Sequence, residues 1–188
     1  SSLNLEKYDE WKDDKIMIND VMRFLDNVLT DFIDRAPDQF ADAKYSAERE
    51  RSVGLGVMGF HSYLQKNQIP LESVMSKVWN KKIFKHIQEN VDQASKDLAE
   101  ERGPCPDAAD YGFSERFSNK TAIAPTASIS IICGGASPGV EPVAANSYTH
   151  KTLSGSFNVR NRYLVELLEK HGKNTEEVWS GITTNQGS

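Results

Sequence analysis

Apolar residues recur at helical spacing in two long segments of the chain. Residues 15–36 place them at i, i+3, i+4 and i+7, which predicts an amphipathic helix that Pro37 ends. Residues 71–102 continue this spacing over a greater length, and Gly103 followed by Pro104 is typical of a helix C-terminus. The apolar positions are Val21, Phe24, Leu25, Val28, Leu29 and Phe32 in the first helix, and Val74, Val78, Ile83, Phe84, Ile87, Val91, Ala94 and Leu98 in the second. Each helix is therefore expected to pack one face against a core.

The second half of the chain carries shorter patterns. The run at 120–125 predicts a short buried strand, and residues 147–159 predict a bent strand or a hairpin. Two more helices are expected, at 161–171 and at 175–181, where Asn174 is a candidate cap. Helices alternating with strands in this order favour a mixed α/β fold.

The segments between these elements are predicted to be connections. Residues 38–50 are polar and are expected to link two helices. Residues 105–119 have no clear period and predict a loop with one short turn.

Composition and charge are those of a globular domain. The 188 residues, 38% hydrophobic and 26% charged with a formal net charge of −5, fit a single domain over 1–188 or a large piece of one. No apolar run approaches the roughly 20 residues of a membrane span, and the mild acidity disfavours a general nucleic-acid surface. Both ends lack the polar character of natural termini, so we expect a piece of a longer protein, truncated at both ends.

The glycines of GLGVMG, residues 54–59, match the GxGxxG pattern of dinucleotide-binding folds. That fingerprint requires a buried strand directly before it and an acidic residue about 20 positions later. Residues 45–51 are charged instead, and the later positions hold Trp79 and Asn80. We therefore expect the glycines to serve close backbone packing of a helix that begins near Val57.

The remaining reactive side chains indicate no strong site. Cys105 and Cys133 lie far apart without a CxxC motif, which favours two unpaired thiols in a reducing cytosol over a disulfide or a metal site. The carboxylates Asp97, Glu100 and Glu101 are expected to form a solvated helix face. The histidines are too widely spread to predict a metal cluster: His61, His86, His150 and His171.

Small residues follow Pro125 in the stretch PTASI, residues 125–129. Because proline fits the first turn of a helix, the next backbone N–H groups would be free at a helix N-terminus. Such donors and the helix dipole attract phosphate, and Thr126 and Ser128 add hydroxyl groups. No lysine follows, as it would in a Walker loop, so a helix cap inside a core is the alternative.

Three blocks in order resemble the large (alpha) subunit of ribonucleotide reductases. They are ERERSVGLGVMGFHSYL, DLAEERGPCPD, and APTASISIICGGASPGVEP followed by NSYTHKTLSGSFNVRNRYL. The last block resembles class I bacterial or phage enzymes more than the adenosylcobalamin-dependent class, which typically has Gly where Ala127 stands. The likeness extends over essentially the whole chain and corresponds to the C-terminal part of the catalytic barrel.

This resemblance implies a fold and a function. The fold would be part of a ten-stranded α/β barrel, and the intact enzyme would reduce ribonucleotides to deoxyribonucleotides by a thiyl-radical mechanism. The loop matching Pro125, Thr126, Ala127, Ser128 and Ile129 would bind the substrate phosphates through backbone amides and hydroxyls. Some relatives have a hydroxyl residue where Ile129 stands, so Ile129 would contribute only its main-chain N–H.

The resemblance also implies partners and missing parts. The radical cysteine, the reducing cysteines and the relay tyrosines would lie outside this chain, since Cys105, Cys133, Tyr148 and Tyr163 do not match their positions. No catalytic residue is therefore assigned, and the chain alone is expected to be inactive and poorly soluble. The intact cytoplasmic enzyme, in a bacterial or phage-infected cell, would form a homodimer. It would rely on the radical or metal cofactor of a small (beta) subunit, and this chain would bind no cofactor. The alternatives are a fragment of an adenosylcobalamin-dependent reductase and a non-catalytic packing module.

Overall fold

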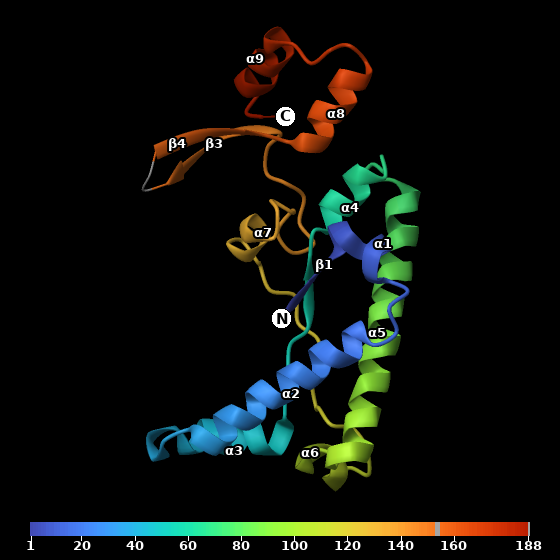
Figure 1. The fold of residues 1–188 in the computed structure, drawn as a ribbon, viewed down its shortest axis with the longest axis vertical. Helices are drawn as coiled ribbons and strands as arrows, with labels where there is room; N and C mark the ends of the chain where they lie inside the picture. Colours follow the sequence, from blue (N-terminus) through green and yellow to red (C-terminus); the bar gives the residue numbers. More distant parts are fainter. Residues whose placement is uncertain (153–154, 188) are drawn as a thin grey trace.

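Two long helices form the frame of the molecule. The computed structural model describes residues 1–152 and 155–187. Helix α5 (Val74–Arg102) runs along the molecule, and α2 (Met17–Arg35) crosses it (Figure 1). Helix α5 begins after Ser73, whose hydroxyl accepts the N–H of Ser76 at 3.2 Å, and ends at Gly103 with φ +86°. Both predicted helices are confirmed.

The apolar stripe predicted for α2 is only partly buried. Phe24 and Val28 are 61% and 51% exposed, and the buried face of α2 instead carries Ile18, Met22 and Asp26. The helix has apolar residues on more than one side, so spacing alone did not identify the side that faces the core. In α5 the prediction holds from Ile83 onward, since the later apolar positions are buried except for Phe84, which is partly buried.

Three extended segments run parallel beside the two helices. Strand β1 (Ser2–Asn4) pairs with β2 (Gly56–Met58), with Leu3 opposite Val57. On the other side of β2, Leu55 forms a parallel bridge with Thr121. The backbone of β2 is therefore central among the three segments.

The glycines of the central segment allow this close approach. A Cβ on Gly56 would lie 2.2 Å from the carbonyl oxygen of Ala122, which no side chain tolerates. The predicted close packing is confirmed, and the predicted helix is formed, but it begins three residues after Val57. Val57 lies in β2, and α4 (Phe60–Lys66) begins after Gly59, whose φ of +79° turns the chain.

Shorter elements complete the N-terminal two thirds of the chain. Residues 38–50, predicted to be a connection, instead form helices η2 and α3. Because α3 buries none of its residues, its sequence has no hydrophobic period, and ion pairs of Arg49 with Asp107 and Asp110 fix it to α6. The short elements are η1 (Leu5–Lys7), α1 (Tyr8–Trp11), η2 (Asp38–Phe40), α3 (Ala41–Glu50), α6 (Pro106–Asp110) and α7 (Ile129–Ile132).

The strand predicted at 120–125 is not formed. The structure gives this segment only the Leu55–Thr121 bridge, and residues 121–125 are exposed. The apolar composition predicted a buried strand. In the structure, this backbone has a neighbouring strand, β2, on one side only, so it is neither fully paired nor buried. The single turn predicted within 105–119 is confirmed as α6.

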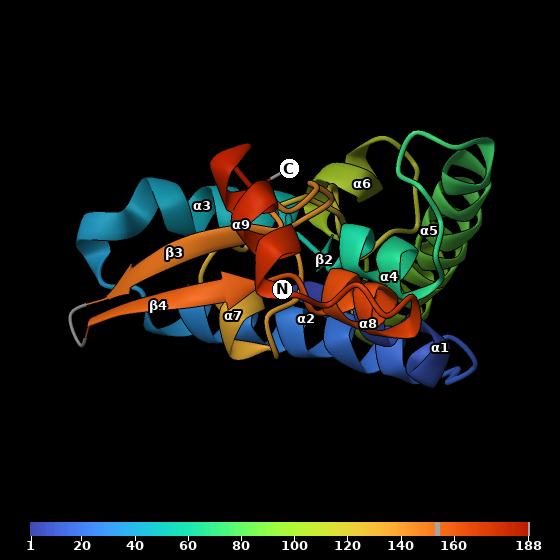
Figure 2. The same ribbon diagram turned by 90° about the horizontal axis from the view of Figure 1, so that it is seen from above.

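The C-terminal part is a hairpin followed by two helices. Strands β3 (Ser147–Thr152) and β4 (Gly155–Arg160) pair antiparallel and project away from α4 and α5 (Figure 2). Helices α8 (Arg162–Lys170) and α9 (Glu176–Thr184) follow. The predicted hairpin and helices are confirmed, although Thr175, and not Asn174, caps α9.

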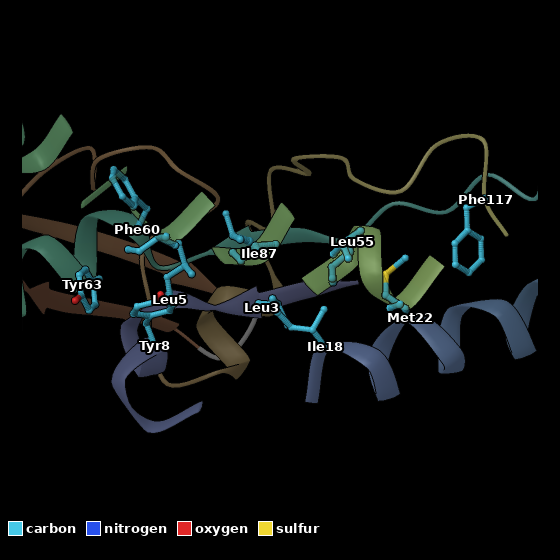
Figure 3. Close-up of a cluster of buried hydrophobic side chains, with 14 of the residues drawn as sticks. Leu3, Leu5, Tyr8, Ile18, Met22, Leu55, Phe60, Tyr63, Ile87 and Phe117 are labelled. Atoms are coloured by element: carbon cyan, nitrogen blue, oxygen red, sulfur yellow. The ribbon is translucent and has the colours of Figure 1, made fainter. Parts of the chain in front are cut away.

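One hydrophobic core lies between α5, α2, α4 and the parallel segments. Figure 3 shows Leu3 of β1, Leu55 directly before β2, and side chains of the three helices in this core. Complete burial of one such aliphatic side chain contributes about 1.5 to 3 kcal/mol. The core residues are Leu3, Leu5, Tyr8, Ile18, Met22, Leu55, Val57, Phe60, Tyr63, Leu64, Ile83, Ile87, Val91, Ala94, Leu98 and Phe117.

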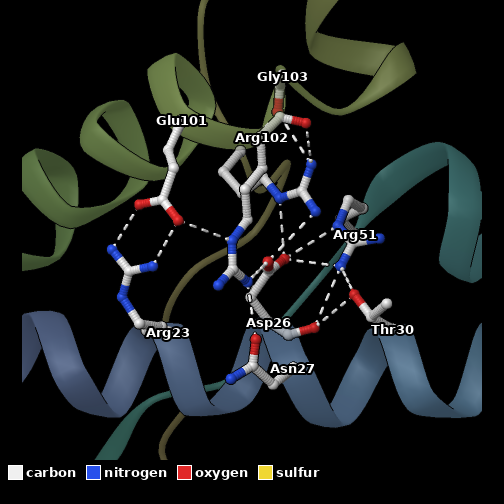
Figure 4. A network of polar contacts seen from close by, with 9 residues as sticks. Arg23, Asp26, Asn27, Thr30, Arg51, Glu101, Arg102 and Gly103 are labelled. Atoms are coloured by element: carbon white, nitrogen blue, oxygen red, sulfur yellow. Dashed lines mark hydrogen bonds and ion pairs between the residues drawn. The ribbon is translucent and has the colours of Figure 1, made fainter.

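A buried carboxylate joins four parts of the chain beside this core. Asp26 of α2 is fully buried and binds Arg51, Arg102 and Arg116 at 2.7, 2.8 and 2.9 Å (Figure 4). Arg51 also donates to the Thr30 hydroxyl at 2.6 Å. Burial raises the pKa of Asp26, but hydrogen bonds from the three guanidinium groups outweigh burial, so the pKa lies below its usual range.

A second ion pair joins the same two helices. Glu101 accepts two hydrogen bonds from Arg23, both at 2.7 Å, and these hydrogen bonds lower its pKa to about 2. Asp97 accepts from Asn19 at 3.4 Å. The carboxylates predicted as a purely solvated face therefore include two that contact α2.

The fold class is mixed α/β, as predicted. Residues 1–152 and 155–187 form two two-stranded sheets, one parallel and one antiparallel. A ten-stranded barrel is not present within them.

Replacement of Asp26 by Asn is expected to destabilise the fold strongly. The three guanidinium groups would lose their common anion while they stay largely buried, at a cost of about 3 to 5 kcal/mol. Asp31→Asn is the control, because Asp31 forms an exposed ion pair with Arg35 worth less than about 1 kcal/mol. Urea unfolding followed by tryptophan fluorescence measures the unfolding free energy of both variants. Equal losses of unfolding free energy would contradict the role of Asp26 as the common anion of the three guanidinium groups.

The contribution of Asp26 to the free energy of unfolding should decrease at low pH. Because the folded state lowers its pKa, the carboxylate stabilises the fold at and above the unfolded value of about 4, and this contribution is lost as pH falls through the lower folded value. The difference in unfolding free energy between the native chain and Asp26→Asn should be constant from about pH 5 to 7 and shrink at lower pH. A difference that grows with acidification would be inconsistent with this.

Gly56→Ala should destabilise the chain while Gly181→Ala does not. The new methyl group at position 56 would overlap the Ala122 carbonyl, and forced overlap costs about 1 to 3 kcal/mol. Gly181 lies inside α9, and a Cβ added there would have nothing within 4 Å, so alanine should stabilise that helix by about 0.5 to 1 kcal/mol. Thermal unfolding of the two variants should therefore shift in opposite directions.

Candidate functional site

The stretch 125–129 forms an exposed turn before a short helix. The helix was predicted to begin at Pro125 or just past it, but Thr126 has a φ of +53°, which is not helical, and the helix begins at Ile129. Ser128 is the residue before the helix, and its side chain makes no capping hydrogen bond. Pro125, Ala127, Ser128 and Ile129 are all exposed, and Thr126 is half-buried.

The turn presents several backbone N–H groups to its surroundings. Two carbonyl groups of the turn accept hydrogen bonds from the following residues. The N–H of Ser130 donates to the Thr126 carbonyl at 3.0 Å, and the N–H of Cys133 donates to the Ile129 carbonyl at 2.8 Å. In the described part of the chain, no hydrogen bond uses the N–H of Ala127, Ser128 or Ile129. Three successive donors without an intrachain acceptor can bind an anion together.

The hydroxyl of Thr126 has a structural partner. Its Oγ1 accepts the N–H of Gly139 at 2.8 Å, which leaves the hydroxyl proton to donate elsewhere. On the other side of the turn, the buried Ser130 accepts at its carbonyl the N–H of Ala136 at 3.1 Å. The turn is therefore held from both sides by residues 135–139.

Hydrogen bonds attach residues 137–143 to the start of α4. The N–H of Gly59 donates to the Ser137 carbonyl at 2.7 Å, and Ser62 and Ser137 exchange two hydrogen bonds at 2.8 and 3.1 Å. The N–H of Val143 donates to Nδ1 of His61 at 3.2 Å, and burial lowers the pKa of His61. A neutral imidazole can accept this bond, so burial and hydrogen bonding favour the same protonation state.

The glycine turn after α7 is fixed to the C-terminal part. Arg162 of α8 donates to the Gly134 carbonyl at 2.9 Å and forms an ion pair with Glu6. Burial, followed by the nearby Glu6 charge, raises the pKa of Tyr163 to about 12. This tyrosine is therefore neutral at physiological pH.

The other residues considered from the sequence lie apart from this turn or have ordinary roles. Cys105 is buried, Cys133 is exposed, and both are free thiols, which confirms that they are unpaired. Tyr148 lies in β3 and is 47% exposed. Over residues 1–152 and 155–187, no three His, Cys, Asp or Glu side chains are placed to hold a metal ion. Within the same ranges, no helix is both long and apolar enough to cross a membrane.

The sequence did not reveal the residues that support the turn. Ser62, Ser137 and Gly139 lie within two of the blocks that carry the family resemblance, but Ser62 and Ser137 are separated by 75 positions, and neither block predicts their contact. Gly59 has no side chain that could cap α4, and this sequence feature could have indicated a cap from another part of the chain.

Comparisons with known proteins agree with one another. A family model described as the ribonucleotide reductase barrel domain matches residues 1–115 and 107–188. The ribonucleoside-diphosphate reductase large subunit of Invertebrate iridescent virus 6 is 48% identical over 100% of this chain and 20% of its own length. That of Invertebrate iridescent virus 3 is 44% identical over 100% of this chain and 30% of its own length.

A solved structure gives the same result. The class Id ribonucleotide reductase alpha subunit of Actinobacillus ureae is 39% identical, with a TM-score of 0.88 over 100% of this chain and 34% of that chain. The chain thus spans about a fifth to a third of the length of these relatives. The sequence comparison and the structural comparison each cover the whole chain. The chain therefore belongs to the family of ribonucleotide reductase large subunits, within their barrel domain.

Proposed function

We propose that this chain is part of the catalytic barrel of a class I ribonucleoside-diphosphate reductase large subunit. Within it, the turn Pro125–Ile129 would bind the phosphates of the ribonucleotide substrate. The observation that carries this proposal is the exposed turn with three adjacent N–H groups that have no intrachain acceptor.

The chemistry of the turn supports an anionic ligand. Ala127 and Ser128 are small, so a phosphate oxygen can approach the main chain closely. Ile129 can contribute its N–H group, and its side chain is 43% exposed. The Ser128 hydroxyl makes no capping bond and can donate to the same anion, as can the Thr126 proton.

The parallel segments support a place in a barrel wall. In β1, β2 and residues 119–122 the backbones run parallel, with β2 in the centre and further pairing possible at both edges. A parallel wall covered by α2, α4 and α5 agrees with the proposed ten-stranded α/β barrel. Likeness to an alpha subunit described as class Id favours class I over the adenosylcobalamin-dependent class.

The radical chemistry is proposed to involve parts outside this chain. Cys105 is fully buried in the structure, and neither it nor Cys133 is assigned to thiyl-radical or disulfide chemistry. The remainder of the large subunit, in a homodimer, would supply the reacting thiols. A small subunit would supply the radical or metal cofactor. The contribution of this chain would be to hold the substrate by its phosphates.

The double variant Thr126→Val, Ser128→Ala should weaken substrate binding. It removes both hydroxyl donors of the turn, and hydrogen bonds to a charged group contribute about 1.5 to 3 kcal/mol each. In a complete large subunit containing this chain, assayed with its small subunit, we expect KM for the ribonucleoside diphosphate to rise by at least about tenfold.

The matched control is Ser180→Ala, Thr184→Val on α9. Ser180 and Thr184 are exposed, as Ser128 is, and the Thr184 hydroxyl donates to the Ser180 carbonyl at 2.9 Å. Their removal should leave KM and kcat unchanged. Unchanged kinetics in the Thr126, Ser128 variant would mean that the turn has a structural role only.

A further inference from the structure

The N-terminus of α4 has no cap of its own. The residue before the helix is Gly59, which has no side chain to accept the N–H of the third helical residue, Ser62. Gly59 cannot readily be replaced by a capping residue. Its φ is +79°, and a Cβ there would lie 2.8 Å from Oδ1 of Asn4 and 3.0 Å from the N–H nitrogen of Glu6. The cap must therefore come from another part of the chain.

Ser137 takes the place of the missing cap. Its Oγ accepts the N–H of Ser62 at 3.1 Å, and Oγ of Ser62 accepts the N–H of Ser137 at 2.8 Å. This reciprocal pair is a capping box in which the capping residue comes from 75 positions away. Both serines are buried, with 3% and 1% of their surface exposed, so neither N–H group has water as a substitute. We call this pair the serine box.

The serine box is connected to the turn by two short links. Two residues after Ser137, the N–H of Gly139 donates to the Thr126 hydroxyl at 2.8 Å. One residue before Ser137, the N–H of Ala136 donates to the Ser130 carbonyl at 3.1 Å. Ser130, Ala136, Ser137 and Gly139 are buried, whereas residues 121–125 and 131–135 are exposed. The buried contacts that fix the turn relative to β2 and α4 are thus made through residues 136–139.

We propose that Ser62 and Ser137 are positioning residues for substrate phosphate binding. This inference rests on the proposed function of the turn Pro125–Ile129. The serine box would hold the N–H groups of Ala127, Ser128 and Ile129 at a fixed place relative to α4. Neither serine would touch the substrate. Loss of the box would shift or loosen the donors without removing any of them.

Ser62→Ala and Ser137→Ala test this in a complete large subunit containing this chain, assayed with its small subunit. Each should raise KM for the ribonucleoside diphosphate by about tenfold and change kcat by less than about twofold. The double variant should resemble the single variants, because either substitution breaks the box and the effects are not additive. An effect that is the sum of the two single effects would overturn the proposal.

Ser95→Ala is the matched control. Ser95 is also a buried serine, and its Oγ accepts a backbone N–H, that of Arg116, at 3.1 Å. It lies on α5, away from the turn, so its removal should lower stability while leaving KM unchanged. If Ser95→Ala raises KM as much as the other two, the effect is general destabilisation and the proposal is overturned.

Gly139→Ala tests the link without touching the buried serines. Gly139 has a φ of +50°, and a Cβ there would lie 3.3 Å from the Ala124 carbonyl oxygen. The substitution should displace its N–H from Thr126 and raise KM severalfold in a folded protein. An unchanged KM would overturn the proposal even if the serine variants do not fold.

The results also separate this inference from the proposed function. If Thr126→Val, Ser128→Ala raises KM and the serine variants do not, the turn binds phosphate but the serine box does not position it. If none of these variants changes KM, both proposals are overturned.

Discussion

The ion pairs of one buried carboxylate connect four segments of the chain. Asp26 has no exposed surface, yet it forms ion pairs with three guanidinium groups that come from three different parts of the chain. A lone buried charge would be costly, but here the surrounding cations and hydrogen bonds compensate for its loss of water. Arg51 follows α3, Arg102 ends α5, and Arg116 precedes the third parallel segment. The cluster therefore fixes one end of each of these segments relative to α2.

The candidate site depends on this arrangement through a series of contacts. Arg51 has a left-handed φ of +44° and leads the chain from α3 into the segment that becomes β2. Strand β2 ends at Met58, and Gly59 then turns the chain into α4. The start of α4 is capped by Ser137, which lies in the loop after α7, and the turn 125–129 directly precedes that helix. The ion pairs of Asp26 therefore help to set the position of the turn, through the backbone of β2 and the hydrogen bonds between α4 and Ser137.

The sequence predicted what depends on local periodicity and missed what depends on distant neighbours. Helices α2, α5, α8 and α9 were predictable because apolar residues recur along each sequence at helical spacing, and the hairpin because residues that favour strands lie on both sides of Gly155. Helix α3 was missed because it has no buried apolar face, and ion pairs of Arg49 fix it to α6. The strand expected at 120–125 failed because apolar composition does not show how many strands lie beside a segment. At the candidate site, small residues after Pro125 predicted an open main chain, but the left-handed Thr126 and the support from Ser62 left no sequence pattern.

The separation of the two serines has a consequence for folding. Contacts between residues far apart in sequence require closure of a long loop, and they form more slowly than contacts within a helix. The serine box joins residues 75 positions apart, and it requires the start of α4 and the loop after α7 to be in place together. A newly synthesised chain should therefore form its helices first and the exposed turn last. Folding intermediates would have most of the secondary structure but no ordered group of backbone donors for a ligand to recognise.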